Sequence, residues 1–415
     1  MIDSKKVINA LPAMRSGKEL LSALEVLPEY DSGIIEADIP TRLMALSDLY
    51  RLYVPSQMSV EIYSKLYLAL LRSLQKKGTK IAVQQQYQNL KAIRQQEYNG
   101  IIGGSDSFTI IGSSGIGKSS AISRAVSLIT ENRVIEVENP CSKIIPCVTV
   151  QCPFDSSVKG LLLEILRKVD EVLDGNYYQN ALRARATTDM LIGSVSQVAL
   201  NHIGMLIVDE IQNVANSKNG KSLIGALTQL INNSGISICM VGTPESMIFF
   251  EQAMQLARRS VGLQYNTMDF NGYFQNFCKV LFGYRYVKDA ELTDAVTEWL
   301  YEHSAGVVSI VVSLVHDAQE MAILDGREVM DITTLNEAYQ KRLSMLHGYI
   351  QPTIQKKSQT SKAVKKQNHI PQDVTIGKEV QGEYLIAELA SKAKNGGLDI
   401  VRLLKEHMPV AEVSV

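Results

Sequence analysis

The segment GSSGIGKS, at residues 112–119, restricts the fold of this 415-residue chain more than any other feature. It matches the pattern G-x-x-x-x-G-K-[ST], which is typical of a phosphate-binding loop. The apolar run FTIIG precedes it, and the helix-like stretch SSAISRAVSLI follows it. Glycines let such a loop curl until its N–H groups point at a phosphate, and the start of the helix adds partial positive charge. We therefore predict a strand, a loop and a helix that together bind the phosphates of a nucleotide.

The residues of this loop have separate predicted roles. Lys118 is expected to reach the β- and γ-phosphates, and the Ser119 hydroxyl is placed to bind Mg²⁺. The alternative interpretation, a glycine-rich turn with a chance lysine, does not account for the flanking strand and helix. The remaining predicted nucleotide contacts are Gly112, Ser113, Ser114, Gly115, Ile116, Gly117 and Ser120.

Two further apolar runs end in polar residues that suit the same site. MLIVDE, at residues 205–210, ends in Asp209 and Glu210. We expect Asp209 to hold Mg²⁺ through water and Glu210 to polarise the attacking water, whereas the alternative is a solvated acidic pair. ISICMVGT, at residues 236–243, ends in Thr243. This hydroxyl is expected to contact the γ-phosphate or the attacking water, and the alternative is a simple helix N-cap.

A pair of arginines follows the last of these runs. The segment LARRS contains Arg258 and Arg259. Phosphoryl transfer is accelerated by an arginine that a neighbouring subunit supplies, and one of these two residues is expected to be that arginine. Arg258 is the first choice, but the sequence does not decide between them, and two solvated surface arginines are the alternative.

The order of patterns along the chain predicts an α/β fold. Apolar runs at 108–112, 145–152, 205–210 and 236–243 alternate with helical patterns, which indicates a parallel sheet covered on both faces within residues 101–270. Residues 1–100 are mostly helical, with 81–98 either a helix or a connector. Residues 271–350 are predicted to form a helical lid with a break near Gly306. Residues 351–381 are predicted to be a flexible basic linker, and 382–415 a short helical tail.

Composition limits the class of protein. The length suggests two or three domains, and a formal net charge of -1 gives no overall attraction to nucleic acid. No uninterrupted apolar run approaches the roughly 18 residues that span a bilayer, so we expect no membrane segment. The five cysteines form no CxxC pair, which argues against a zinc site, and their odd number and scattered placement favour a reducing cytoplasm. They are Cys141, Cys147, Cys152, Cys239 and Cys278.

With these elements in this order, the chain resembles the AAA+ ATPases, and within them the TnsC/TniB transposition regulators. Three passages carry the narrower resemblance: VINALPAM at 7–14, VTVQCPFDSSVKGLLLEILRKVDEVLDGNY at 148–177, and MLIVDEIQNV followed by ICMVGTPES. The second passage resembles a strand, then Pro and Lys, then a helix in that family, and the third follows the spacing of its Walker B and sensor elements. The resemblance covers roughly residues 7–345.

The resemblance implies a function. Proteins of this kind bind ATP with Mg²⁺, assemble as rings or filaments around double-stranded DNA, and link a target selector of the TnsD/TniQ type to the TnsA/TnsB transposase subunits. Hydrolysis controls their disassembly. The C-terminal tail is expected to bind the transposase. The positions that match the DNA-facing ones of the family are Lys159, Arg183, Arg185, Thr187 and Thr188.

Some interpretations stay open at this point. Lys159 also suits an exposed helix lysine, and Thr187 or Thr188 a helix N-cap. Residues 308–310 lack the arginine that many AAA+ lids place there, which suits a slow switch. A helicase loader, a secretion-associated ATPase, or a scaffold with ATP as a structural ligand are alternatives. Subunit number, filament geometry, DNA footprint and the identity of the selector are not written in the sequence.

Overall fold

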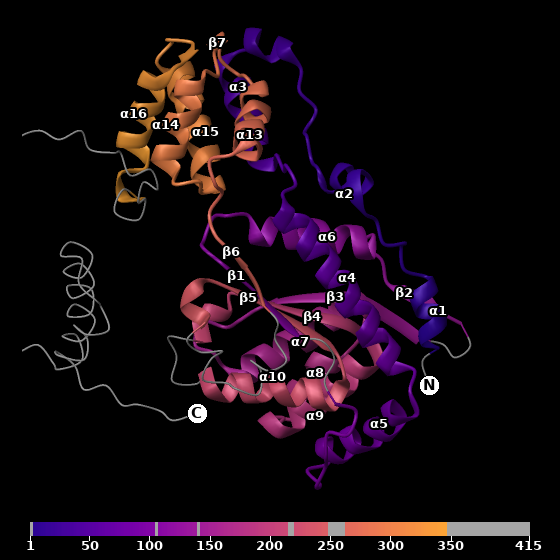
Figure 1. Cartoon of the computed structure of the whole chain (residues 1–415). Coiled ribbons are helices and arrows are strands. Elements are labelled where there is room, and N and C mark those ends of the chain that lie inside the picture. Colours follow the sequence, from indigo (N-terminus) through magenta and orange to yellow (C-terminus); the bar gives the residue numbers. More distant parts are fainter. Residues whose placement is uncertain (1–2, 104–106, 139–141, 215–219, 248–261, 347–415) are drawn as a thin grey trace, which may run out of the picture. The chain divides into compact units, whose positions relative to one another are not determined.

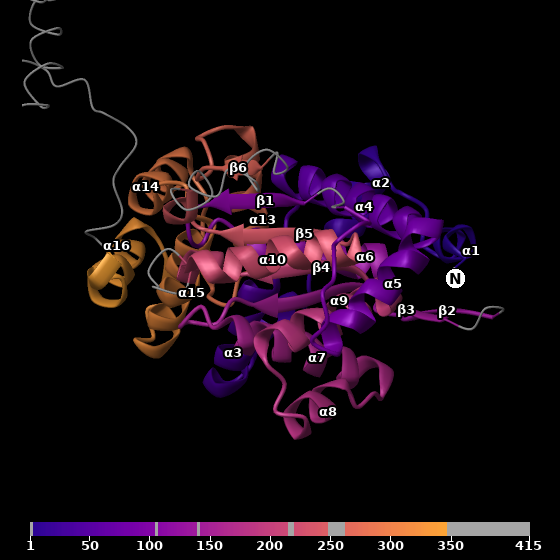
Figure 2. The ribbon, with the colours of Figure 1, turned by 90° about the horizontal axis from the view of Figure 1, so that it is seen from below.

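The computed structural model describes residues 3–103, 107–138, 142–214, 220–247 and 262–346 (Figure 1). Its centre is a six-stranded sheet with the order β2-β3-β4-β5-β1-β6, which can be followed across Figure 2. All neighbours in it pair in parallel except β2 and β3, which are antiparallel. The strands are β1 (Phe108–Gly112), β2 (Ile135–Val137), β3 (Ser142–Gln151), β4 (Ile203–Asp209), β5 (Ser237–Gly242) and β6 (Leu263–Tyr265).

The four predicted strands are confirmed as β1, β3, β4 and β5, and the prediction of a mostly parallel sheet is also confirmed. The sequence did not predict β2 and β6. Each has three residues and lies at an edge of the sheet, so neither contains enough apolar residues to show a pattern.

Helices cover both faces of the sheet, which explains why nearly every residue of β1, β4 and β5 is buried. On β4, Leu206 and Val208 belong to one apolar cluster, whereas Met205 and Ile207 belong to the other. Figure 1 shows α4 and α6 on one side of the strands and α7, α9 and α10 on the other. These helices are α4 (Gln57–Lys77), α6 (Lys118–Thr130), α7 (Val158–Leu173), α9 (Thr188–His202) and α10 (Gly220–Ser234), and the short α8 (Tyr177–Arg183) joins α7 to α9.

The N-terminal helices divide between two cores. The cluster that contains α4 also includes residues of α1 (Ser4–Asn9) and α2 (Gly17–Leu24), so these helices help to cover the sheet. The segment left open between helix and connector forms a helix, α5 (Lys80–Ile93), which packs against α9. In contrast, α3 (Ile39–Leu46) and the 3₁₀ helix η2 (Ser47–Arg51) contribute Leu46 and Leu49 to the core of the C-terminal helices.

Those C-terminal helices form the region predicted as the lid. They are α13 (Gly272–Gly283), α14 (Asp294–Ser304), α15 (Val308–Leu324) and α16 (Ile332–Arg342), with the two-residue strands β7 (Asp289–Ala290) and β8 (Val329–Met330). The predicted break near Gly306 is confirmed between α14 and α15, where φ of Gly306 is +72°. A Cβ atom there would lie 2.1 Å from the Met268 carbonyl oxygen, so only glycine fits this turn. Within the described part of the chain, no helix combines the length and the apolar character needed to cross a bilayer.

The cysteines of the described residues behave as small apolar side chains. Cys152, Cys239 and Cys278 are buried, and Cys147 is partly buried. Burial raises the pKa of the Cys152 thiol to about 11 and that of Cys278 to about 12, so both stay protonated near neutral pH. Cys141 lies outside the described residues.

A buried arginine ties the N-terminal segment to the lid. The Arg42 side chain, on α3, is 4% exposed. Its Nε donates to the carbonyl oxygen of Tyr286 at 2.9 Å, and its Nη1 donates to Glu328 Oε1 at 2.8 Å. The Arg42 hydrogen bond is the main cause that lowers the pKa of the Glu328 carboxyl group. The segment of α3 and η2 is therefore held to the lid by an ion pair as well as by apolar packing.

We expect Arg42→Ala to lower the free energy of unfolding by about 2–4 kcal/mol, because it leaves the Tyr286 carbonyl and the Glu328 carboxylate without their buried partner. Arg51→Ala is the matched control, since Arg51 is 72% exposed and pairs with Asp48 at the surface. Its loss should cost no more than about 0.5 kcal/mol. Urea unfolding of both variants, followed by circular dichroism, checks the difference, and equal losses would contradict it.

Candidate functional site

The predicted phosphate-binding loop lies between β1 and α6, as the motif requires. Gly115 and Gly117 have φ values of +79° and +95°, which L side chains rarely adopt. At Gly112, a Cβ atom would lie 2.6 Å from Ile116 Cδ1 and 2.7 Å from the Tyr265 carbonyl oxygen. The three glycines are therefore needed for the curvature of the loop or for its close packing against β6.

Lys118 begins α6, and its side chain folds over the loop. The residue is 9% exposed, and its Nζ donates to the carbonyl oxygens of Gly112 at 2.7 Å and Ser113 at 2.8 Å. Burial lowers the pKa of Lys118, and the nearby carboxylates of Asp209, Glu210 and Glu245 act in the opposite direction. The loop thus holds an ammonium group at the place where the phosphates of a nucleotide are expected.

The sheet brings the Ser119 hydroxyl to the first acid of the pair at the end of β4. Ser119 Oγ donates to Asp209 Oδ2 at 3.3 Å, although the two residues are ninety positions apart in the sequence. A hydroxyl beside a carboxylate is an oxygen donor set of the kind that Mg²⁺ prefers. The predicted metal ligands Ser119 and Asp209 therefore lie together, and their chemistry fits this ion.

Glu210 adopts an unusual backbone conformation at the same strand end. Its φ is +58°, and its backbone N–H donates to Asp209 Oδ1 at 2.8 Å. The exposed carboxylate accepts a hydrogen bond from the Gln212 side-chain amide. A non-glycine residue with positive φ is strained, and such strain is common where a side chain must be aimed. The turn presents Glu210 to the pocket while Gln212 holds its carboxylate.

Thr243 lies beside this pair because β5 separates β1 from β4. It directly follows β5, lines the same pocket as Lys118 and Glu210, and occupies the N-cap position of the 3₁₀ helix η4 (Pro244–Ser246) without a side-chain cap hydrogen bond. A hydrogen bond from Thr243 is the main cause that lowers the pKa of the Glu245 carboxyl group. The cap and the predicted phosphate contact are compatible, because the residue faces the pocket in this position.

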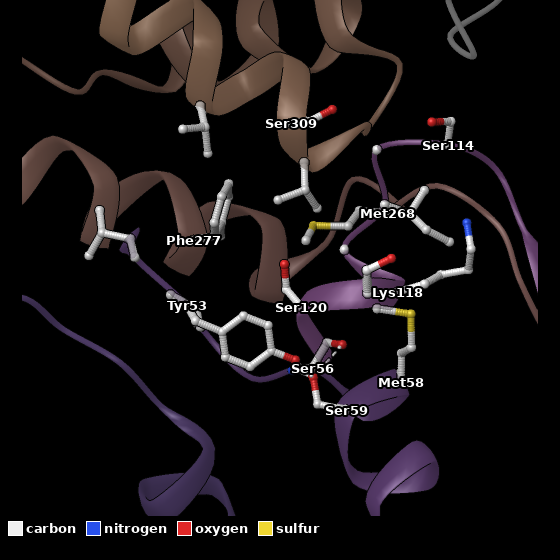
Figure 3. Close-up of a pocket in the computed structure, with 18 of the residues that line it drawn as sticks. Tyr53, Ser56, Met58, Ser59, Ser114, Lys118, Ser120, Met268, Phe277 and Ser309 are labelled. Atoms are coloured by element: carbon white, nitrogen blue, oxygen red, sulfur yellow. Dashed lines mark hydrogen bonds between the residues drawn. The ribbon is translucent and has the colours of Figure 1, made fainter. Parts of the chain in front are cut away.

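The pocket around these residues has a volume of about 400 Å³. Figure 3 shows Ser309 and Phe277 above it, on lid helices, and Tyr53, Met58 and Ser59 below it, on the N-terminal segment, with Lys118 and Ser120 between them. Tyr53 Oη and Ser59 Oγ are 2.7 Å apart and form a hydrogen bond. The N-terminal segment, the P-loop, the ends of β4 and β5, and the lid therefore share one cavity.

The lid touches the P-loop directly. The backbone N–H of Ser309, at the start of α15, donates to the Gly115 carbonyl oxygen at 3.0 Å. A Cβ atom at Gly115 would lie 2.3 Å from Ser309 Oγ and 2.9 Å from Val307 Cγ1, so this glycine is required for the contact as well as for the loop. The described residues that line the pocket include no arginine. The lid residue that is hydrogen-bonded to the loop is Ser309.

The predicted DNA-facing residues lie on α7, α8 and α9 or beside them. Lys159 is the second residue of α7, and Thr187 caps α9, where its side chain accepts from the Met190 N–H at 3.4 Å. Both helices begin at the carboxyl edge of the sheet, because α7 follows the end of β3 and α9 runs back to the start of β4. All five predicted residues are exposed: Lys159, Arg183, Arg185, Thr187 and Thr188.

Some residues of the site were not predicted, and some predicted residues are not described. Gln212 follows the acid pair by two positions, so its place in the sequence was a usable signal. The pocket wall at residues 49–59 and the lid residue Ser309 belong to no motif. Arg258 and Arg259 lie outside the described residues, as do the linker and the tail beyond residue 346.

Comparisons with known proteins agree with this site. Residues 85–266 match the family model described as bacterial TniB protein. The matched region includes the P-loop, the acid pair and Thr243, but the N-terminal passage at residues 7–14 lies outside it. No curated protein matches the sequence of the chain.

Three solved structures are similar at low identity. The Aeropyrum pernix ORC1 protein in complex with DNA has 11% identity and a TM-score of 0.42, over 63% of this chain and 64% of that one. The Drosophila ORC bound to DNA has 11% identity and a TM-score of 0.44, over 97% and 84%. A structure that describes katanin self-assembly has 14% identity and a TM-score of 0.37, over 76% and 92%. This chain thus spans 64% of the first of these proteins, and the likenesses are too weak to carry an argument about function.

The family match agrees with the resemblance that the sequence showed, and the fold is the α/β P-loop core with helical N- and C-terminal regions that the resemblance implied. Its P-loop strand and its acid-pair strand are separated by the strand that ends in Thr243. Over residues 85–266, the chain is therefore similar to the bacterial TniB proteins.

Proposed function

We propose that this protein is an ATP-dependent regulator of DNA transposition, which assembles on double-stranded target DNA and links a target selector to the transposase. The observation that carries the proposal is the pocket in a TniB-family region where Lys118, Ser119 and Asp209 meet. A lid and an N-terminal segment line the same pocket, so a bound nucleotide would contact several parts of the fold at once. This arrangement suits a switch.

The proposed nucleotide is ATP with Mg²⁺. Lys118 binds the β- and γ-phosphates, and the P-loop N–H groups surround them. Ser119 and Asp209 would hold the ion, whose charge would offset the charge that develops on the transferred phosphoryl group. Glu210 polarises the attacking water, and Thr243 contacts the γ-phosphate or that water.

The apolar part of the pocket suits the adenine base. Leu49, Leu52 and Val54 line it from the N-terminal segment, and Phe277 and Val312 line it from the lid. A base packed between these two walls buries apolar surface on both, which favours one position of the lid. ATP would thereby fix the lid against the core.

Assembly then depends on the neighbouring subunit. Arg258 or Arg259 of one subunit completes the site of the next and senses the γ-phosphate. The lid brings Ser309 to the P-loop in place of an arginine. Hydrolysis is therefore slow, and its role is to weaken the subunit interface and to release the assembly from DNA.

DNA and protein partners would use other surfaces. Lys159, Arg183 and Arg185 neutralise backbone phosphates, while Thr187 or Thr188 bonds a phosphate at the start of α9. Such contacts carry little base specificity, so the target is chosen by a selector of the TnsD/TniQ type. The C-terminal tail binds the transposase subunits of the TnsA/TnsB type.

The first test is electron microscopy of the purified protein with a slowly hydrolysed ATP analogue, with and without duplex DNA. We expect rings or filaments only when both are present.

We also expect Lys118→Ala to weaken ATP binding by about 10- to 100-fold, because it removes charge-assisted bonds to phosphate, and to abolish assembly. Lys221→Ala, an exposed lysine on α10, is the control. Filaments of Lys118→Ala, or rings of the wild type that ignore DNA, would count against the proposal.

We expect Glu210→Gln to reduce ATP hydrolysis by about 10²- to 10⁴-fold and to leave ATP affinity unchanged, because an amide cannot accept the proton of the attacking water. Assemblies on DNA should then persist after free ATP is removed. The measurements are phosphate release and filament lifetime, with the exposed Glu171→Gln on α7 as the control. Normal turnover in Glu210→Gln would remove this residue from its role.

We expect Lys159→Ala to weaken DNA binding and to reduce the slope of log affinity against log salt concentration by about one for each phosphate that the variant no longer neutralises. Lys168→Ala is a matched control on the same helix, since Lys168 lies toward the other end of α7 and pairs with Glu171. Fluorescence anisotropy with a labelled duplex at several salt concentrations gives both slopes. An unchanged slope for Lys159→Ala would exclude a phosphate contact.

A further inference from the structure

The turn between β3 and α7 exposes an aromatic ring. Phe154 is 91% exposed, which is the highest value among the large apolar side chains of the described residues. An aromatic side chain of this size gains about 1.5–3 kcal/mol when it is buried, so the free molecule forgoes that stabilisation at this position. A ring that is displayed in this way is suited to contact a partner.

The turn holds Phe154 outward by backbone geometry. The Ser156 N–H donates to the Pro153 carbonyl oxygen at 2.9 Å, and the Ser157 N–H donates to Asp155 Oδ1 at 3.0 Å. Ser156 is buried and has a φ of +51°. The ring therefore projects from a closed turn, and its position does not depend on packing of the ring itself.

The turn is also fastened to the strand that carries the acid pair. The Cys152 N–H donates to the Asp209 carbonyl oxygen at 2.8 Å. Asn213, in the 3₁₀ helix η3 (Ile211–Val214), donates through Nδ2 to the Cys152 carbonyl oxygen at 3.0 Å and accepts at its own carbonyl oxygen from Ser156 Oγ at 3.1 Å. A partner that pushes on Phe154 would thus meet a rigid support.

The charges around the ring define the partner. Lys159 is exposed five residues further on, and the N-terminus of the sixteen-residue helix α7 adds partial positive charge beside it. Arg185, just before α9, belongs to the same edge of the sheet. Asp155 is the one acid in the turn, and its carboxylate is engaged by the Ser157 N–H. An exposed apolar tip on the same edge of the sheet as Lys159 and Arg185 matches a ligand with phosphates outside and stacked rings inside, which is double-stranded DNA.

We propose that Phe154 inserts into the groove of duplex DNA and partly unstacks one base step while Lys159 pairs with a flanking phosphate. The inference rests on the proposed DNA binding and extends it from phosphate contacts to the base stack. Apolar wedges of this kind kink the duplex, and pyrimidine–purine steps such as TA and CA unstack most easily. The assembly would therefore favour flexible sequences without reading any base directly.

The test compares Phe154→Ala with the wild type, Phe154→Leu and Lys159→Ala on a duplex that contains 2-aminopurine, in the presence of the slowly hydrolysed ATP analogue. The control is Met44→Ala, which removes a side chain that is 79% exposed on α3. Because aromatic contacts with bases do not release counterions, Phe154→Ala should weaken DNA binding by about tenfold with no change in salt slope. Binding of the wild type should increase the fluorescence of 2-aminopurine in the duplex, because the base is unstacked. This increase should be absent with Phe154→Ala, whereas Phe154→Leu should keep most of it.

The outcomes separate this inference from the proposed function. If Phe154→Ala binds with wild-type affinity, or if the fluorescence increase persists in it, the wedge is excluded while the DNA-binding proposal stands. A salt slope lowered in Phe154→Ala as much as in Lys159→Ala would also exclude the wedge, since it would indicate that fewer phosphates are neutralised. If the wild type does not bind the duplex at all, the proposed function fails together with the inference. Unchanged ATP binding in each variant confirms that the site remains folded.

Discussion

The parallel pairing of β3, β4, β5 and β1 is the constraint on which the site depends. Parallel strands end at the same edge of a sheet, so the P-loop, the acid pair and Thr243 meet there although they are far apart in the sequence. The pairing is stable because both faces are buried, with alternate residues of β4 such as Leu206 and Ile207 in opposite clusters. The chemistry at the edge follows from the packing of the faces.

The lid adds a second constraint through one small residue. Gly115 serves the curvature of the P-loop and also admits Ser309, whose N–H reaches its carbonyl oxygen. A side chain at position 115 would meet the Ser309 and Val307 side chains and would also be strained by the φ of +79°. Since α3 and η2 belong to the lid core and Arg42 joins them to Glu328, the N-terminal segment is bound to the lid where it lines the pocket. One cavity is thus lined by the N-terminal segment, the P-loop and the lid.

The sequence predicted the parts of the fold and of the site whose signals are local. The runs before Gly112, Asp209 and Thr243 are mostly apolar because those strands are buried on both faces, and the P-loop has a fixed spacing. The pocket wall at residues 49–59 could not be predicted, because its residues are ordinary apolar and hydroxyl side chains placed by long-range packing. The same holds for the contact of Ser309 with Gly115, which depends on the path of the whole lid.

The end of β4 links the two surfaces that the proposed function requires. Asp209 holds Ser119 with its side chain and Cys152 with its carbonyl oxygen, so the same residue belongs to the nucleotide pocket and to the base of the Phe154 turn. Asn213 makes a second connection between the same two sites. Its N–H donates to the Glu210 carbonyl oxygen at 3.1 Å, and its side-chain amide donates to the Cys152 carbonyl oxygen. The Glu210 turn and the turn that carries Phe154 are thus both hydrogen-bonded to Asn213. Under the proposed function, these hydrogen bonds join the nucleotide pocket to the DNA-binding turn, and coupling between the two would require that Asn213 and its neighbours have two arrangements.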